Sequence, residues 1–122
     1  MKTNTNVLEW LEAQSSSPIA RRTSEILRHK DMKPVADEPA SVTVSEALRL
    51  WKTRLSNIPH TGQPIEGINE LIGSLELLTP QRKVNQYGFT GKGSAAAVFF
   101  SRDSHEFLGS AIVTGRRSDK VT

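Results

Sequence analysis

A glycine-rich segment, residues 88–94 with the sequence GFTGKGS, has the residue types that could hold a phosphate group. Glycines let backbone amides approach an anion, and a lysine neutralises its charge. A phosphate-binding loop, however, requires a glycine, four residues, and then Gly-Lys-Ser or Gly-Lys-Thr leading into a helix. Here Lys92 is followed by Gly93 and by a sequence typical of a strand. We therefore interpret the segment as a hairpin turn, and we expect no cofactor.

Acid–base or metal chemistry could use the polar side chains of Asp103, His105 and Glu106. These residues fall at the tip of a predicted hairpin, where exposure to water leaves no pocket and no desolvation. Ser104 and His105 are adjacent, so their side chains diverge and do not form a catalytic pair. The chain also has no cysteine. We therefore predict no catalytic residue and no metal site, and we expect that the protein is not an enzyme.

Aromatic and basic side chains share one face of a predicted strand at 83–89, a pattern that could stack single-stranded bases. The last third of the chain, residues 81–122, holds seven basic and three acidic side chains. A nucleic-acid-binding accessory protein is therefore one alternative. Its contacts would be Arg82, Lys83, Tyr87, Lys92, Arg116 and Arg117. A DNA-binding helix-turn-helix is disfavoured, because its second helix, 65–78, carries three glutamates and no basic residue.

Residues 95–113 predict a hairpin that is apolar on both faces. With a four-residue turn at 102–105, Phe100 lies opposite Phe107 on one face. On the other face Phe99 lies opposite Leu108, and Ile112 shares that face. A solvated face would be more polar. Two interpretations follow. In the first, helices cover one face and only the edge of the other is partly exposed to water. In the second, the other face binds a partner protein or a second copy of the chain.

The elements that precede the hairpin are predicted to be four amphipathic helices, at 7–14, 19–30, 44–55 and 65–78. Gly67 and Gly73 weaken the last of these, and a helix that keeps two glycines usually packs closely against a neighbour. Residues 31–41 contain two prolines and no hydrophobic period, which predicts an extended linker.

The order of these elements predicts an α+β fold, with N-terminal helices followed by a three-stranded antiparallel meander and helices packed on one face. In this interpretation residues 1–30 form an N-terminal helical arm and 31–41 the linker. Residues 42–115 form the body, and 116–122 a basic tail. In the alternative interpretation, the first two helices pack over the sheet and the linker runs across the surface.

The size and composition of the chain favour a small binding protein. Its 122 residues suit one domain that buries a core without disulfides. No stretch is apolar enough to cross a bilayer, and Glu9 and Glu12 interrupt the start where a signal peptide would be apolar, so we expect a cytoplasmic protein without a membrane contact. The leading hypothesis is a regulator, adaptor or inhibitor that binds a protein partner, or a second copy in a homodimer. Its predicted contacts are Trp10, Phe99, Leu108 and Ile112.

Overall fold

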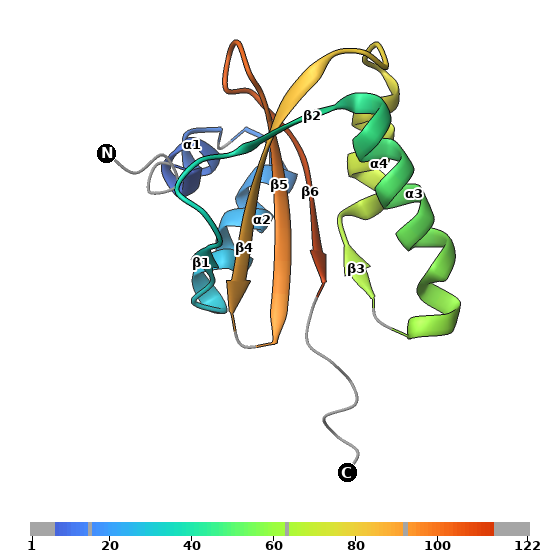
Figure 1. Ribbon diagram of the computed structural model, residues 1–122. Helices are drawn as coiled ribbons and strands as arrows, with labels where there is room; N and C mark the ends of the chain where they lie inside the picture. The colour runs from blue at the N-terminus through green and yellow to red at the C-terminus, as the bar shows by residue number, and fades with distance from the viewer. Residues whose placement is uncertain (1–6, 15, 63, 92, 114–122) are drawn as a thin grey trace.

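The fold is built on an antiparallel sheet whose centre is a three-stranded meander (Figure 1). The computed structural model describes residues 7–14, 16–62, 64–91 and 93–113. The meander consists of β4 (Lys83–Gly91), β5 (Ser94–Ser101) and β6 (Phe107–Val113). Three short strands extend it: β1 (Lys33–Pro34) and β2 (Ala40–Thr43) pair with β4, and β3 (Ile65–Glu66) pairs with β6. The predicted α+β class is confirmed, but the described residues form six strands rather than three.

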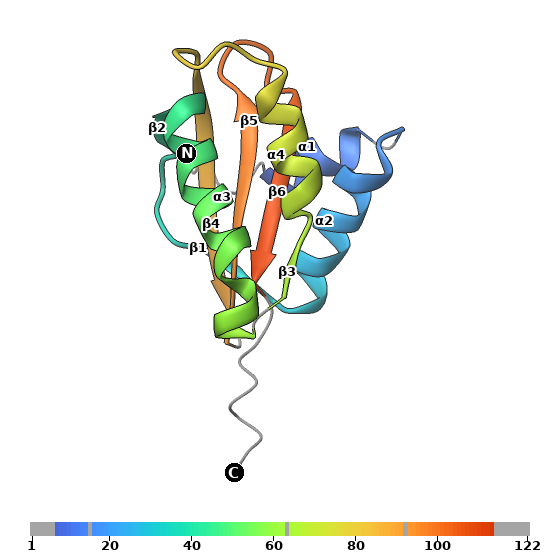
Figure 2. The same ribbon diagram turned by 90° about the vertical axis from the view of Figure 1, so that its right-hand side faces the viewer.

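Two pairs of helices cover the two faces of this sheet (Figure 2). The first pair is α1 (Val7–Ala13) and α2 (Pro18–His29), and the second is α3 (Val44–Thr61) and α4 (Ile68–Glu76). Val7, Leu11 and Leu27 of the first pair form one buried cluster with Tyr87 and Phe100 of the sheet. The helices thus cover both faces, not one as the sequence predicts, because helices as short as α1 need a surface to pack on. The first two helices pack over the sheet, as in the alternative interpretation of the sequence.

The predicted linker, residues 31–41, lies along the outer edge of β4. It is extended as expected, but its ends pair as β1 and β2, and between them Val35 donates its backbone N–H to the carbonyl oxygen of Gly88 at 2.8 Å. Pro34 and Pro39 have no N–H, and proline in an edge segment discourages pairing with a further strand. The segment therefore closes this edge of the sheet.

A bulge in the β5–β6 hairpin changes the predicted register. Phe100 pairs with Phe107 as expected, whereas Phe99 pairs with Gly109. Leu108 is therefore an extra residue on β6, and every pair beyond it is shifted by one position. The turn length alone carries no information about such an insertion.

The shift separates two residues that were expected to share a face. A one-residue change of register moves a side chain to the other side of a sheet. Ile112 therefore packs in the cluster beneath α1 and α2, together with Phe100. Phe99 packs in the cluster beneath α3 and α4, and Leu108 borders that cluster.

α3 begins at the predicted residue and runs further than predicted. The hydroxyl oxygen of Thr43 accepts from the Glu46 N–H at 3.0 Å, and the Glu46 carboxylate accepts from the Thr43 N–H at 2.9 Å. This hydrogen bond from the Thr43 backbone lowers the pKa of the Glu46 carboxyl. The helix passes the predicted end at residue 55, includes Pro59 in its last turn, and ends at Gly62, whose φ of 73° is left-handed.

The predicted helix at 65–78 is divided by Gly67, which separates β3 from α4. Gly67 has a φ of +85°, and a Cβ there would lie 2.6 Å from the carbonyl oxygen of Ser110. Glycine is required here because a side chain disfavours this φ and would collide with β6. Gly73 is different, since no described atom outside its own helix backbone lies within 4 Å of the position of its missing Cβ.

The two glycines therefore make a matched pair of substitutions. We expect Gly73→Ala to raise the free energy of unfolding by about 0.5–1 kcal/mol, because alanine loses less backbone entropy in a helix. Gly67→Ala should lower the free energy of unfolding by about 1–3 kcal/mol, because of the strained φ and the collision with Ser110. Urea unfolding measures both changes. Equal effects of the two substitutions would contradict the close approach of Gly67 to β6.

Candidate functional site

Two of the residues predicted to bind a protein partner lie in the core. Phe99 is 0% exposed and Ile112 is 1% exposed, on opposite faces of the sheet. Leu108 is half-buried beside the cluster of α3 and α4. In the described conformation these side chains stabilise the fold and offer little surface to another molecule.

Trp10, the fourth predicted contact, holds α1 against the sheet. Its ring makes edge contacts with Phe100 and Tyr87, at centroid distances of 5.5 and 5.9 Å. The imidazole of His105 lies over the same indole at 4.5 Å. Aromatic pairs in this geometry attract one another beyond the effect of burial alone. The half-buried Trp10 is therefore an anchor between the first helix and the tip of the β5–β6 hairpin.

The residues of the nucleic-acid alternative do not form one surface among the described residues. Tyr87 is 2% exposed, and burial raises the pKa of its phenol. A base could stack on Tyr87 only if α1 left the sheet. Arg82 and Lys83 are exposed at the start of β4. Lys92, Arg116 and Arg117 lie outside the described residues, as does the predicted basic tail at 116–122.

The described part of the chain contains no cluster of three histidine, cysteine or acidic side chains that could hold a metal ion. At the hairpin tip, the imidazole of His105 packs on the Trp10 ring. None of the described helices has the length and apolar character needed to cross a membrane.

A hollow of the described surface lies between α2 and the β3–α4 corner, above β6, and we call it the α2–β3 groove. Its volume is about 240 Å³. An adjoining hollow of about 420 Å³ continues along α2 and shares Arg22, Ile26 and Glu66 with it. The floor is apolar, and the rim carries charges of both signs. The groove is lined by Pro18, Ile19, Arg22, Thr23, Ile26, Glu66, Gly67, Glu70, Ser110 and Ile112.

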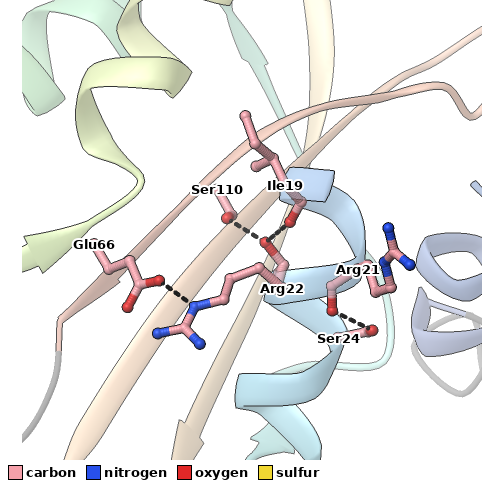
Figure 3. A network of polar contacts seen from close by, with 7 residues as sticks. Ile19, Arg21, Arg22, Ser24, Glu66 and Ser110 are labelled. Carbon is pink, nitrogen blue, oxygen red and sulfur yellow. Dashed lines mark hydrogen bonds and ion pairs between the residues drawn. The ribbon is translucent and has the colours of Figure 1, made fainter. Parts of the chain in front are cut away.

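An ion pair crosses the mouth of the α2–β3 groove. Arg22 donates from Nε to the Glu66 carboxylate at 2.7 Å (Figure 3). This hydrogen bond raises the pKa of the Arg22 guanidinium above its ordinary value. Both side chains are exposed to water, which weakens their attraction, so the pair contributes little to stability. Each charge can therefore exchange its present partner for a group on another molecule.

Two hydroxyl groups meet at the buried end of the groove. The Thr23 hydroxyl donates to the Ile19 carbonyl oxygen at 2.8 Å, and it also lies 2.8 Å from the Ser110 hydroxyl (Figure 3). A hydroxyl has one hydrogen, so Ser110 donates to Thr23. Thr23 and Ser110 are each about 2% exposed, so this bond fixes α2 against β6 beneath the groove.

The groove is assembled from segments that are far apart in the sequence. Arg22 and Glu66 are separated by 44 residues, and Thr23 and Ser110 by 87. No motif links residues at such separations. The sequence carries one relevant signal: the apolar residues of the predicted helix at 19–30, Ile19, Ile26 and Leu27, form only a thin line, and Ile19 lies at the edge of the buried surface.

Comparison with known proteins finds no match to this chain among protein-family models, curated proteins or solved structures.

The Thr23–Ser110 contact predicts a coupling between the two hydroxyls. Thr23→Val keeps the shape of the side chain but leaves the buried Ser110 hydroxyl without its partner, so the free energy of unfolding should fall by about 1–3 kcal/mol. Ser110→Ala should cost less, because Thr23 still donates to Ile19.

Urea unfolding of both single variants and of the double variant measures this coupling. The double variant removes both hydroxyls, so its cost should be smaller than the sum of the two single costs. Additive costs would show that the two groups do not interact in solution.

Proposed function

We propose that the protein is a small non-enzymatic regulator, adaptor or inhibitor that binds a protein partner in the α2–β3 groove. The observation that carries the proposal is an apolar hollow with a charged rim beside a sheet that helices cover on both faces. Protein interfaces commonly have an apolar centre surrounded by polar side chains. The groove has both parts within one continuous surface.

The chemistry of the groove suggests what a partner would supply. Ile19 is 39% exposed and borders the hollow, while Ile26 and Ile112 form the buried floor. A side chain of the size of leucine or methionine from the partner would fit into this space and bury Ile19. Such a side chain is a typical interface anchor, since anchors sit in pockets from which water is excluded.

The charged rim can orient the partner. Arg22 presents a positive charge, and Glu66 and Glu70 present negative charges on the opposite wall. A partner with charges of both signs beside its apolar side chain could pair with these groups in one orientation only. The nucleic-acid alternative has less support, because phosphate would meet the two glutamates and because Tyr87 is buried.

The proposal predicts that one surface substitution removes partner binding. In Ile19→Asp a charge replaces the exposed apolar side chain at the groove. Burial of an isoleucine contributes about 1.5–3 kcal/mol, so affinity for the partner should fall at least about tenfold. Val35→Asp is the matched control, because Val35 is also an exposed apolar residue but lies at the β4 edge.

The measurement begins with capture of binding proteins from the source cells on immobilised wild type and both variants, followed by titration with the purified partner. The expected partner binds wild type and Val35→Asp alike and binds Ile19→Asp at least about tenfold more weakly. A partner that binds all three proteins equally would place its contact outside the groove and contradict the proposal.

A further inference from the structure

The last strand of the sheet ends at the rim of the α2–β3 groove. β6 ends at Val113, which pairs with Ile65, and the preceding Ile112 pairs with Glu66. Ile112 and Glu66 both line the groove. Figure 2 shows the end of β6 beside β3. The chain that follows, residues 114–122, therefore starts next to the groove, and we call it the C-terminal segment.

The walls of the α2–β3 groove and of the adjoining hollow carry a net negative charge when histidine is neutral. Glu66 and Glu70 line the groove, and Glu25 lines the adjoining hollow. The lysine and arginine side chains among these residues are Arg22 and Lys30. Within the described part of the chain, Glu66 is the only one of the three glutamates in an ion pair. The exposed carboxylates of Glu25 and Glu70 are therefore available to a basic group.

The C-terminal segment carries the opposite charge. Its basic residues are Arg116, Arg117 and Lys120, and Asp119 is its one acidic residue. An extended chain advances about 3.3–3.6 Å per residue, so both arginines are attached within about 15 Å of chain from the end of β6. Gly115 precedes them, and glycine accepts the left-handed conformations in which a chain reverses. The segment thus has the charge and the reach to return to the groove.

We propose that the C-terminal segment of the same chain occupies the α2–β3 groove, with Arg116 and Arg117 paired to Glu66 and Glu70. Ion pairs at an exposed rim are individually weak. The attachment of the segment to β6, however, makes its binding intramolecular, with an effective concentration in the millimolar range. The segment therefore exchanges between a bound and an unbound state, and another molecule can displace it.

This exchange regulates access to the groove. While the segment is bound, the apolar floor and the rim carboxylates are not open to a partner. The apparent affinity for a partner is reduced in proportion to the fraction of molecules with an open groove. The regulatory part of the proposal rests on the proposed function, whereas the binding of the segment does not.

Paramagnetic nuclear magnetic resonance of the full chain tests the binding of the segment without a partner. The chain has no cysteine, so Ser118→Cys provides one attachment site for a nitroxide label inside the segment. The amide signals of Ile26 and Glu70 should lose intensity that they keep when Arg116→Ser and Arg117→Ser are added.

The serine variant is the reference because it keeps the length and the attachment of the segment. Its broadening is that of a segment without attraction to the carboxylates. In about 1 M salt, where charges are screened beyond about 3 Å, the difference between the two labelled proteins should disappear. Equal loss of intensity in both proteins at low salt would overturn the proposal.

Two glutamine variants of the labelled protein test which carboxylate attracts the segment. Glu70→Gln should reduce the loss of intensity at Ile26, because it removes a carboxylate of the groove. Glu38→Gln is the matched control, since Glu38 is also exposed but lies beside β4, at the opposite edge of the sheet from β3. Equal effects of the two substitutions would contradict binding in the groove.

Titration with the partner obtained on the immobilised protein tests the competition. The full-length variant with Arg116→Ser and Arg117→Ser should bind that partner about two- to fivefold more tightly than wild type, because its groove is open in more of the molecules. Unchanged affinity would overturn the regulatory part of the proposal. A partner that binds Ile19→Asp as tightly as wild type contradicts the proposed function instead, and the paramagnetic experiment then decides the binding of the segment.

Discussion

The burial of β5 on both faces is the constraint on which the rest of the structure depends. Phe99 points toward α3 and α4, and its neighbours Val98 and Phe100 point toward α1 and α2. One layer of helices can cover only one of these faces, so the chain places a helix pair on each side. α1 has seven residues and is too short to persist alone in water. The sheet stabilises α1, and α1 in turn covers aromatic side chains of the sheet that would otherwise be exposed to water.

The α2–β3 groove arises where this coverage ends. α2 reaches β6 beside the Thr23–Ser110 bond, and the space beyond it, up to the β3–α4 corner, is the α2–β3 groove. The candidate site is therefore a margin of the core. Its floor is apolar because it continues the core, and its rim is charged because it reaches water.

The sequence predicted the elements well and their pairing less well. Local signals located the start of every helix except α4, including the capping box at Thr43, because such signals act within one turn. The bulge at Leu108 and the break at Gly67 were missed, since both depend on how α4 packs on β6. Strands of two residues, such as β1 and β3, are too short to show a period. The α2–β3 groove could not be predicted, because its ion pair joins residues 44 positions apart.

The mutual dependence of the sheet and the first two helices is tested most directly by urea unfolding of a chain that lacks residues 1–30. Removal of residues 1–30 would expose Tyr87, Phe89 and Phe100, which are buried in the full chain. Each such side chain contributes about 1.5–3 kcal/mol when buried, and the sum approaches the whole stability of a typical domain. The shortened chain should therefore lose its cooperative unfolding transition. A cooperative transition at the urea concentration of the full chain would contradict this dependence.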